Sequence, residues 1–230
     1  MLSKLSKMTP LKQTLIRLLA RPSAVVAALL PSRRSIRVMR RLNRIILSAP
    51  QLLAIAQKIE EQAPCRVLIF GVGHDSLFWH RLNRNGRTVF LEDDEGWLRK
   101  VTAKVKNLQA YAVGYDTEQK DWQRYLGNPA LLVMDLPLPV TERPWDLILV
   151  DGPAGWCDNA PGRMKSIYLA HQLVKPGGDV FVHDCEREVE EAFCERFLGR
   201  ENLIREIAAP QGLLRHYRIL SPGPKRPPTN

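Results

Sequence analysis

The stretch Arg66 to Ser76 reads RVLIFGVGHDS and decides the fold class of this chain. Its first part, Val67 to Phe70, is a continuous apolar run, which is typical of a parallel strand buried on both faces. Gly71 and Gly73 follow it, and Asp75-Ser76 opens a helical pattern. Glycines allow a sharp turn and let a ligand approach the backbone closely, so this strand, turn and helix predict a nucleotide-binding unit.

The next apolar run ends in acidic residues. Thr88 to Leu91 is followed by Glu92-Asp93-Asp94, about twenty residues after the glycine turn. A carboxylate at this place can accept hydrogen bonds from two ribose hydroxyls. The glycine pair alone also fits a plain structural turn, because the full G-x-G-x-x-G pattern is absent. Together with the acidic strand end, it favours a cofactor that contains a nucleoside.

Beyond Cys65 the chain alternates between strand and helix patterns, which predicts an α/β fold with a doubly wound, mostly parallel sheet. The predicted strands are 67–70, 88–91, 109–113, 145–150 and 179–182, with a closing antiparallel hairpin at 203–208 and 214–219. The predicted helices are 77–82, 96–106, 119–126, 163–174 and 188–198, with 131–134 left open between strand and loop and 176–178 as a turn. We expect a basic helical segment over 1–62, the α/β domain over 63–220 and an unstructured Pro-rich tail over 221–230.

The net charge of +10 on 230 residues is unevenly distributed. Residues 1–60 hold twelve Lys or Arg and one acid, whereas the remaining residues hold 22 bases and 23 acids. The α/β domain is therefore almost neutral. This distribution, without aromatic residues among the basic ones, argues against a nucleic-acid partner.

The basic segment itself has three interpretations. Its apolar residues recur at helical spacing between arginines over 32–62, which fits a helical cap packed on the domain. The same pattern fits peripheral attachment to an anionic membrane or docking to a biosynthetic partner. A nucleic-acid patch is the weakest of the three. The longest apolar region, Leu11 to Leu30, is interrupted by charges and a proline, so no transmembrane span is predicted.

The four cysteines predict a reducing compartment. Cys65, Cys157, Cys185 and Cys194 lie far apart and form no C-x-x-C pair, so neither a zinc site nor a disulfide framework is indicated. We expect packing cysteines in a cytoplasmic, and at most membrane-peripheral, protein.

Polar side chains gather where the predicted parallel strands end. They are Gly71–Asp75, Glu92, Tyr115–Thr117, Asp151 and His183-Asp184. Ligands bind at the carboxyl ends of the strands in such sheets. Each residue could separately cap a helix or form a turn, as Asp151-Gly152-Pro153 suggests. Because four of the five parallel strands end in a carboxylate, we favour a cofactor site beside an acid/base site.

Six pieces, in this order, resemble one known family. They are RVLIFGVGHDSLFW, TVFLEDD, WDLILVDGPAG, APGRMKSIYLA, VFVHDCEREVE and LLRHYRI, and they span Arg66 to Ile219. The chain resembles the glucuronoxylan 4-O-methyltransferases and irregular-xylem proteins, also called domain of unknown function 579. The resemblance implies a class I methyltransferase fold, S-adenosyl-L-methionine as cofactor and methyl transfer to a glycan hydroxyl, with a uronic acid as the favoured acceptor.

The resemblance also gives the strand-end residues their roles. The methionine part of the cofactor would be held by Gly71, Gly73, His74, Asp75 and Ser76. Glu92 would bind the ribose, and Tyr115 and Thr117 would border the adenine. The usual acid two positions before the first glycine is replaced by Ile69, so the cofactor amine needs another partner.

Asp151 is our first candidate for the base that accepts the proton of the sugar hydroxyl, and His183 is the second. Asp151 and Asp184 could instead hold a divalent cation such as Mg²⁺ or Mn²⁺. The fork of Arg163 suits a uronate carboxylate, although pairing with a nearby acid remains open. Trp156 could stack on a sugar ring.

Two departures from the plant members bear on the acceptor. Those members carry a Golgi anchor and a longer insertion, whereas this chain has the basic segment and a short connection over 127–143. These departures suggest a bacterial-type relative with a different glycan or glycoconjugate. The alternative function is a non-catalytic protein of polysaccharide biosynthesis that binds the cofactor or assists assembly.

Overall fold

The computed structural model describes residues 36, 40, 45–105 and 107–220. The predictions for most of the basic segment before residue 45, and for the tail over 221–230, lie outside the described residues. No helix among the described residues is long and apolar enough to cross a membrane.

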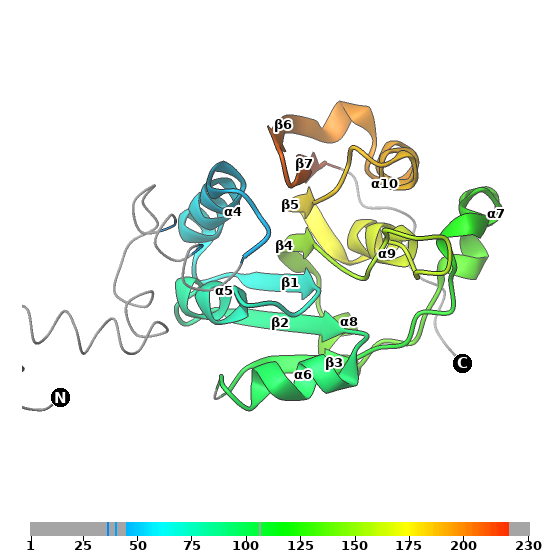
Figure 1. Cartoon of the computed structure of the whole chain (residues 1–230). Helices are drawn as coiled ribbons and strands as arrows, with labels where there is room; N and C mark the ends of the chain where they lie inside the picture. The colour runs from blue at the N-terminus through cyan, green and yellow to red at the C-terminus, as the bar shows by residue number, and fades with distance from the viewer. Residues whose placement is uncertain (1–35, 37–39, 41–44, 106, 221–230) are drawn as a thin grey trace, which may run out of the picture.

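Within the described residues, seven strands form one sheet in the order β3-β2-β1-β4-β5-β7-β6 (Figure 1). Strands β1 to β5 run parallel, and β7 lies antiparallel between β5 and β6. The strands are β1 (Arg66–Phe70), β2 (Arg87–Glu92), β3 (Gln109–Ala112), β4 (Trp145–Val150), β5 (Val174–Val182), β6 (Leu203–Ala209) and β7 (Gly212–Ile219). This is the sheet of a class I methyltransferase, so the predicted doubly wound sheet with its closing hairpin is confirmed.

Helices cover both faces of the sheet (Figure 1). On one face lie α4 (Ala49–Gln62), α5 (Ser76–Leu82) and α6 (Glu95–Thr102), and on the other lie α7 (Trp122–Gly127), α9 (Met164–Leu173) and α10 (Glu188–Phe193). Short elements complete the chain: η2 (Gln119–Asp121), η3 (Pro129–Leu132), α8 (Leu138–Thr141), η4 (Cys194–Leu198) and η5 (Arg200–Asn202).

The central strands are apolar on both sides because each side faces a helical layer. In β1, Leu68 and Phe70 pack into the core beneath α9 and α10, whereas Val67 and Ile69 pack into the core beneath α4 and α5. These four side chains are at most 3% exposed. The apolar run that predicted β1 is continuous because its side chains alternate between two hydrophobic cores. The carboxyl end of this buried strand positions the glycine turn.

The predicted helix over 32–62 is interrupted at residues 45–48, which are not helical. The reason is a capping box at Ser48, whose Oγ accepts from the backbone N–H of Gln51 (3.4 Å). In return, Gln51 Oε1 accepts from the backbone N–H of Ser48 (2.8 Å). Pro50 in the first turn also favours a helix start here. Residues 45–47 are thereby free to line a cavity instead of a helix.

Smaller corrections concern element ends. The predicted turn at Pro176–Gly178 belongs to β5, because Gly178 pairs with Ile219 of β7 and extends the ladder. The open segment 131–134 contains the end of the 3₁₀ helix η3 rather than a strand. α6 ends at Thr102, four residues before the predicted end.

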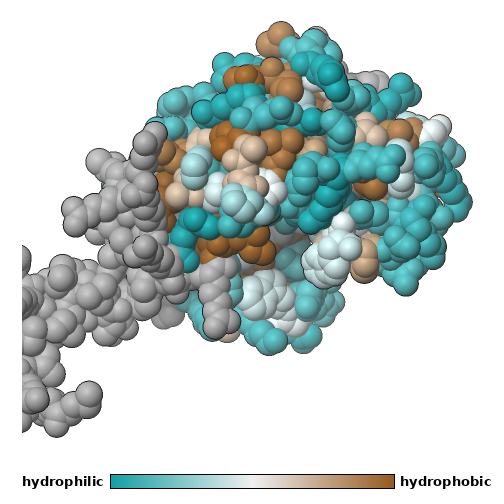
Figure 2. All heavy atoms as spheres, turned by 45° about the horizontal axis from the view of Figure 1, so that its top comes forward, coloured by the Kyte–Doolittle hydropathy of each residue, from teal (hydrophilic) through white to brown (hydrophobic). Residues whose placement is uncertain are grey.

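The edge strand β6 and helix α4 flank a groove of about 550 Å³. The two elements are joined by Gln51, whose Nε2 donates to the carbonyls of Ile207 (3.1 Å) and Gly212 (2.8 Å). In Figure 2 the top of Figure 1 faces the viewer. This view shows apolar surface surrounded by hydrophilic residues. All four cysteines are free, and Cys157 is exposed whereas the other three are buried as expected.

Candidate functional site

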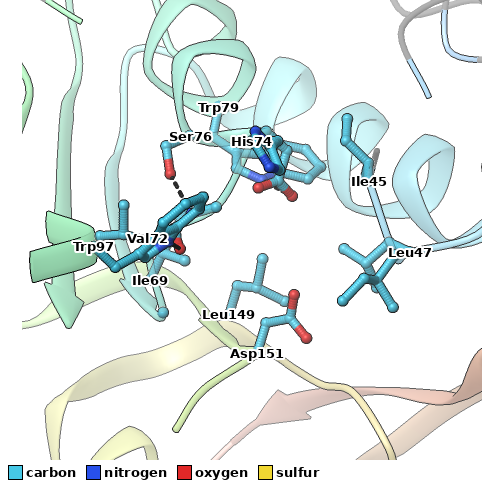
Figure 3. Close-up of a pocket in the computed structure, with 14 residues that line it drawn as sticks. Ile45, Leu47, Ile69, Val72, His74, Ser76, Trp79, Trp97, Leu149 and Asp151 are labelled. Atoms are coloured by element: carbon cyan, nitrogen blue, oxygen red, sulfur yellow. Dashed lines mark hydrogen bonds between the residues drawn. The ribbon is translucent and has the colours of Figure 1, made fainter. Parts of the chain in front are cut away.

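Two adjoining cavities open at the carboxyl ends of the parallel strands. The smaller one, of about 250 Å³, lies between the glycine turn after β1 and residues 45–47 (Figure 3). The larger one, of about 570 Å³, extends from Glu92 past Asp151 to Trp156. Both are lined by Ile46, Gly71, Val72, Trp97 and Asp151. The predicted crevice at the strand ends therefore exists, and it has two compartments.

Gly71 holds the turn after β1 against the end of β4. Its φ of +106° is unfavourable for residues with a side chain, and its N–H donates to the carbonyl of Leu91 (2.8 Å). A Cβ at this position would lie 3.3 Å from the backbone of Asp151. The glycine thus allows the ends of β1 and β4 to approach closely. This agrees with the prediction that Gly71 and Asp151 lie at the same crevice.

The rest of the glycine turn lines the smaller cavity. Gly73 N–H donates to Ser76 Oγ (2.9 Å), and Asp75 Oδ2 accepts from the indole N–H of Trp79 (2.9 Å). Burial and the nearby Asp151 raise the pKa of Asp75 to about 6. His74 lies edge-on to Trp97, with ring centroids 5.3 Å apart. Figure 3 shows the labelled side chains arranged around this space.

Glu92 is held rigidly at the end of β2. Its Oε2 accepts from the N–H of Val72 (2.7 Å), and its Oε1 accepts from the N–H of Asp94 (3.0 Å). The residue is 8% exposed, and burial raises its pKa above the usual value despite these hydrogen bonds. A carboxylate fixed in this way lines the larger cavity and could still accept hydrogen bonds from ribose hydroxyls.

Asp151 lies at the junction of the two cavities. Its Oδ1 is 3.1 Å from His183 Nδ1 and 3.4 Å from Arg163 Nη2. Burial acts to raise the pKa of Asp151, but the hydrogen bond from His183 and the charge of Arg163 outweigh it, so the pKa is lowered. Asp151 is therefore an ionised acceptor with a 27% exposed side chain.

The buried ring of His183 contacts the carboxylate of Asp151. The ring is 1% exposed, and its Nδ1 lies near Oδ1 of both Asp151 and Asp184 (3.1 and 3.3 Å). Since two carboxylates face Nδ1, this nitrogen carries the hydrogen. Nε2 is buried without a hydrogen-bond partner among the described residues, 3.1 Å from where a Cβ of Gly212 would lie. Asp151 is thus the better placed base of the two candidates.

Arg163 does not present a free fork to the crevice. It is 5% exposed, and its guanidinium lies 2.7 Å from Asp184 Oδ2. It also donates to the backbone carbonyls of His183 (2.6 Å) and Asp151 (3.2 Å). These contacts correct the assignment of Arg163 to a uronate carboxylate and support the alternative, pairing with nearby acids.

The same contacts argue against a metal at Asp151 and Asp184. The guanidinium of Arg163 lies between the two carboxylates, where a cation shared by them would bind. Within the described residues, no group of three or more His, Cys, Asp or Glu side chains could hold a metal ion. The predicted divalent cation site is therefore not supported.

Tyr115 and Thr117 line neither cavity. The hydroxyl of Tyr115 is 2.9 Å from Ser166 Oγ on α9, and Thr117 Oγ1 donates to the carbonyl of Pro161 (2.8 Å). The chain leaving β3 runs under the loop before α9, so these side chains anchor that loop. Their predicted place beside an adenine is not supported by these contacts.

Three lining residues were missed by sequence reasoning. Trp97 donates its indole N–H to the carbonyl of Val72 (2.6 Å), and Asp93 lies beside Glu92 on the cavity wall. Arg187 reaches the larger cavity from the start of α10. Trp156, which the sequence did single out, is 77% exposed on the rim of that cavity.

The model of the IRX15/IRX15L/GXM family matches residues 51–130 and 123–217. The chain belongs to this family. It is 42% identical over 184 residues to glucuronoxylan 4-O-methyltransferase 2 of Arabidopsis thaliana. This alignment covers 71% of this chain and 62% of the relative. It is 35% identical over 186 residues to arabinogalactan O-methyltransferase 2 of the same plant, with 70% and 62% covered.

The chain thus spans about three fifths of the length of these family members. Among solved structures, a Thermoplasma acidophilum protein matches with a TM-score of 0.52 at 11% identity, over 82% of this chain and 98% of that chain. TrmN from Thermus thermophilus matches with a TM-score of 0.50 at 15% identity, over 80% and 53%. At these identities, the likeness concerns the fold alone.

Proposed function

We propose that the chain transfers a methyl group from S-adenosyl-L-methionine to a sugar hydroxyl of a glycan, with a uronic acid as the favoured acceptor. The observation that carries the proposal is the position of Asp151, which lines both cavities and is held ionised. Membership in the family supports the acceptor class, because its curated members include glucuronoxylan and arabinogalactan O-methyltransferases.

The residues present fit the proposed cofactor. The turn over Gly71 to Ser76 lines the smaller cavity with glycine backbone and with the short polar side chains of Asp75 and Ser76. Glu92 provides a fixed carboxylate for a ribose, and Trp97 adds an aromatic face on the wall between the two cavities. With Ile69 in place of the usual acid, Asp75 takes the cofactor amine, since it lines the smaller cavity together with Asp151, which is assigned to the acceptor hydroxyl.

S-Adenosylmethionine supplies an electrophilic methyl group when bound. Asp151 then accepts the proton of the acceptor hydroxyl. The ring Nδ1–H of His183 keeps the carboxylate of Asp151 oriented toward this hydroxyl. Arg163 pairs with both Asp151 and Asp184 from the buried side. Trp156 on the rim supplies an apolar face for a sugar ring. Holding the acceptor hydroxyl in line with the methyl carbon and the sulfur that it leaves would supply further rate acceleration.

The experiment has two steps. Calorimetric titration with S-adenosylmethionine and S-adenosylhomocysteine measures cofactor binding, and labelled methyl transfer is then assayed on glucuronoxylan and arabinogalactan. Binding with transfer to a uronic acid residue would support the proposal, whereas no binding would remove the cofactor assignment. Binding without transfer to any glycan would favour the alternative, a non-catalytic cofactor-binding or assembly protein.

A further inference from the structure

Arg187 is the more open of the two arginines that line the larger cavity. Its side chain is 29% exposed, compared with 6% for Arg163. Its Nη2 lies 3.0 Å from Asp184 Oδ2, and its Nη1 donates to the carbonyl of Gly155 (3.1 Å). The guanidinium thus borders both the Asp151–Asp184 cluster and the loop that carries Trp156.

Glu190 lies behind Arg187 in an unusual environment. It is 0% exposed, and neither carboxyl oxygen has a hydrogen-bond partner among the described residues. Its Oε1 is 3.8 Å from Arg187 Nη1, which is too long for a hydrogen bond. Because a buried carboxylate without hydrogen bonds is costly, the neutral acid is favoured here. Accordingly, burial raises the pKa of Glu190 to about 7.

The groups around Glu190 come from several elements. The charged ones are Arg163, Arg187 and Asp184. The side chain of Gln119, from η2, places its own unpartnered Oε1 nearby. These groups meet at the loop that carries Trp156. A Cβ at Gly155 in this loop would lie 2.8 Å from Gln119 Oε1, 3.0 Å from Glu190 Oε1 and 3.3 Å from Arg187 Nη1.

The charges in this cluster balance only when Glu190 is neutral. The carboxylates of Asp151 and Asp184 then match the guanidinium groups of Arg163 and Arg187. The carboxylate of an acceptor would add one negative charge beside Arg187. An ionised Glu190 would add a second one next to the same guanidinium and oppose binding, since like charges in a buried site repel strongly.

We propose that Arg187 binds the carboxylate of a uronic acid acceptor, and that Glu190 is a positioning residue which must hold a proton for this binding. The inference rests on the proposed function, since it takes the acceptor to be a uronic acid glycan in the larger cavity. Above neutral pH, Glu190 loses its proton and competes for Arg187, so acceptor affinity falls. A neutral sugar in the same place would not show this dependence.

The test is calorimetry of a glucuronic-acid-bearing xylo-oligosaccharide on the protein saturated with S-adenosylhomocysteine. At pH 7.5, measured in buffers of different ionisation enthalpy, we expect proton uptake on binding. Between pH 6 and pH 8, the Kd should rise about tenfold, as expected for one linked proton with a pKa near 7. The same oligosaccharide after carboxyl reduction should bind without proton uptake and independently of pH.

Variants complete the design. Glu190→Gln, which keeps the shape of the side chain, should give a flat pH profile, whereas Glu188→Gln on the exposed side of α10 should behave as wild type. Arg187→Met should weaken the uronic acid ligand and leave the carboxyl-reduced one unchanged. A wild-type Kd that does not vary with pH, equal binding of the two oligosaccharides, or no binding at all would overturn the inference.

The outcomes separate this inference from the proposed function. Proton-linked binding without methyl transfer would uphold the role of Glu190 and remove the activity. Methyl transfer with equal KM for the uronic acid and carboxyl-reduced oligosaccharides would uphold the activity and remove the roles of Arg187 and Glu190.

Discussion

Asp151 Oδ1 lies 3.1 Å from His183 Nδ1, and this contact joins the ends of β4 and β5. The backbone supports the same arrangement, because the N–H of His183 donates to the carbonyl of Val150 (3.0 Å). The pair therefore lies directly after the ends of two adjacent strands. Such a position suits a group that must hold a small nucleophile in one orientation.

The first prediction concerns Asp151→Asn. The amide keeps the size of the side chain but cannot accept a proton, so we expect kcat to fall about 10²–10⁴-fold. The Kd for S-adenosylhomocysteine should stay close to that of wild type. Asp158→Asn, in the same loop but exposed, serves as the matched control. Unchanged turnover in the Asp151 variant would rule out its role as the base.

Glu92→Gln should weaken cofactor binding. One carboxylate oxygen would be replaced by an amide group that cannot accept from Val72 or Asp94, and the ribose would lose a charged acceptor. We expect about a 10- to 100-fold rise in the calorimetric Kd for S-adenosylmethionine. The exposed Glu95→Gln should leave the Kd unchanged. An equal effect of both substitutions would contradict the assignment.

Gly71→Ala should destabilise the protein. The substitution forces a side chain into φ +106° and places its Cβ 3.3 Å from the backbone of Asp151. We expect a loss of about 1–3 kcal/mol in the free energy of unfolding, measured by urea denaturation. Gly114→Ala is the control, because a Cβ there would meet nothing within 4 Å. Similar stabilities of the two variants would mean that the close approach is not needed.

The stability of the fold should depend on pH through His216. Its Nε2 donates to Asp179 Oδ1 (2.7 Å), and its Nδ1 is buried without a hydrogen-bond partner among the described residues. Burial lowers the pKa of His216 despite the carboxylate. The unfolded chain therefore binds a proton below about pH 6.5 that the native state does not, so stability falls as pH decreases.

The measurement is the urea midpoint of unfolding between pH 7 and pH 5. The contribution of this histidine, taken as the difference between wild type and the His216 variant, should be a loss of at most about 1.4 kcal/mol per pH unit as the pH falls. His216→Gln should lack this loss on acidification, whereas His74→Gln, with an exposed side chain, should follow wild type. An unchanged slope in the His216 variant would count against this linkage.

Trp156→Ala should affect the acceptor alone. The indole is 77% exposed on the rim of the larger cavity, so its removal costs little folding free energy. We expect a several-fold higher KM for the glycan, corresponding to about 1 kcal/mol of lost stacking, with unchanged cofactor affinity. Leu138→Ala, at 74% exposure, is the control. A rise in KM in the control variant alone would exclude a role for Trp156.

The sequence predicts the parts of the molecule that rest on apolar strands. The run Trp145 to Val150 corresponds to β4 residue for residue, because a strand buried between two helical layers is apolar along most of its length, here at every position except Asp146. The residues at the ends of such strands or directly after them, Gly71, Glu92 and Asp151, accordingly lie at the predicted crevice.

Side chains beyond the strand ends are less predictable. Tyr115 and Thr117 follow a short, half-exposed edge strand, and the chain direction after β3 is set by contacts with Ser166 and Pro161 more than forty residues away. Arg163 could not be told from a ligand-binding arginine, because its partner Asp184 is distant in sequence. By contrast, the break before α4 had a local signal, since Ser48 and Gln51 have the spacing of a capping box.

The five residues shared by the two cavities have a kinetic consequence. A cofactor bound along Val72, Trp97 and Asp151 becomes part of the wall that the glycan contacts. We therefore expect an ordered mechanism in which the glycan associates productively after the methyl donor. The spent cofactor would then leave after the methylated sugar, so its release is a candidate for the slow step of turnover.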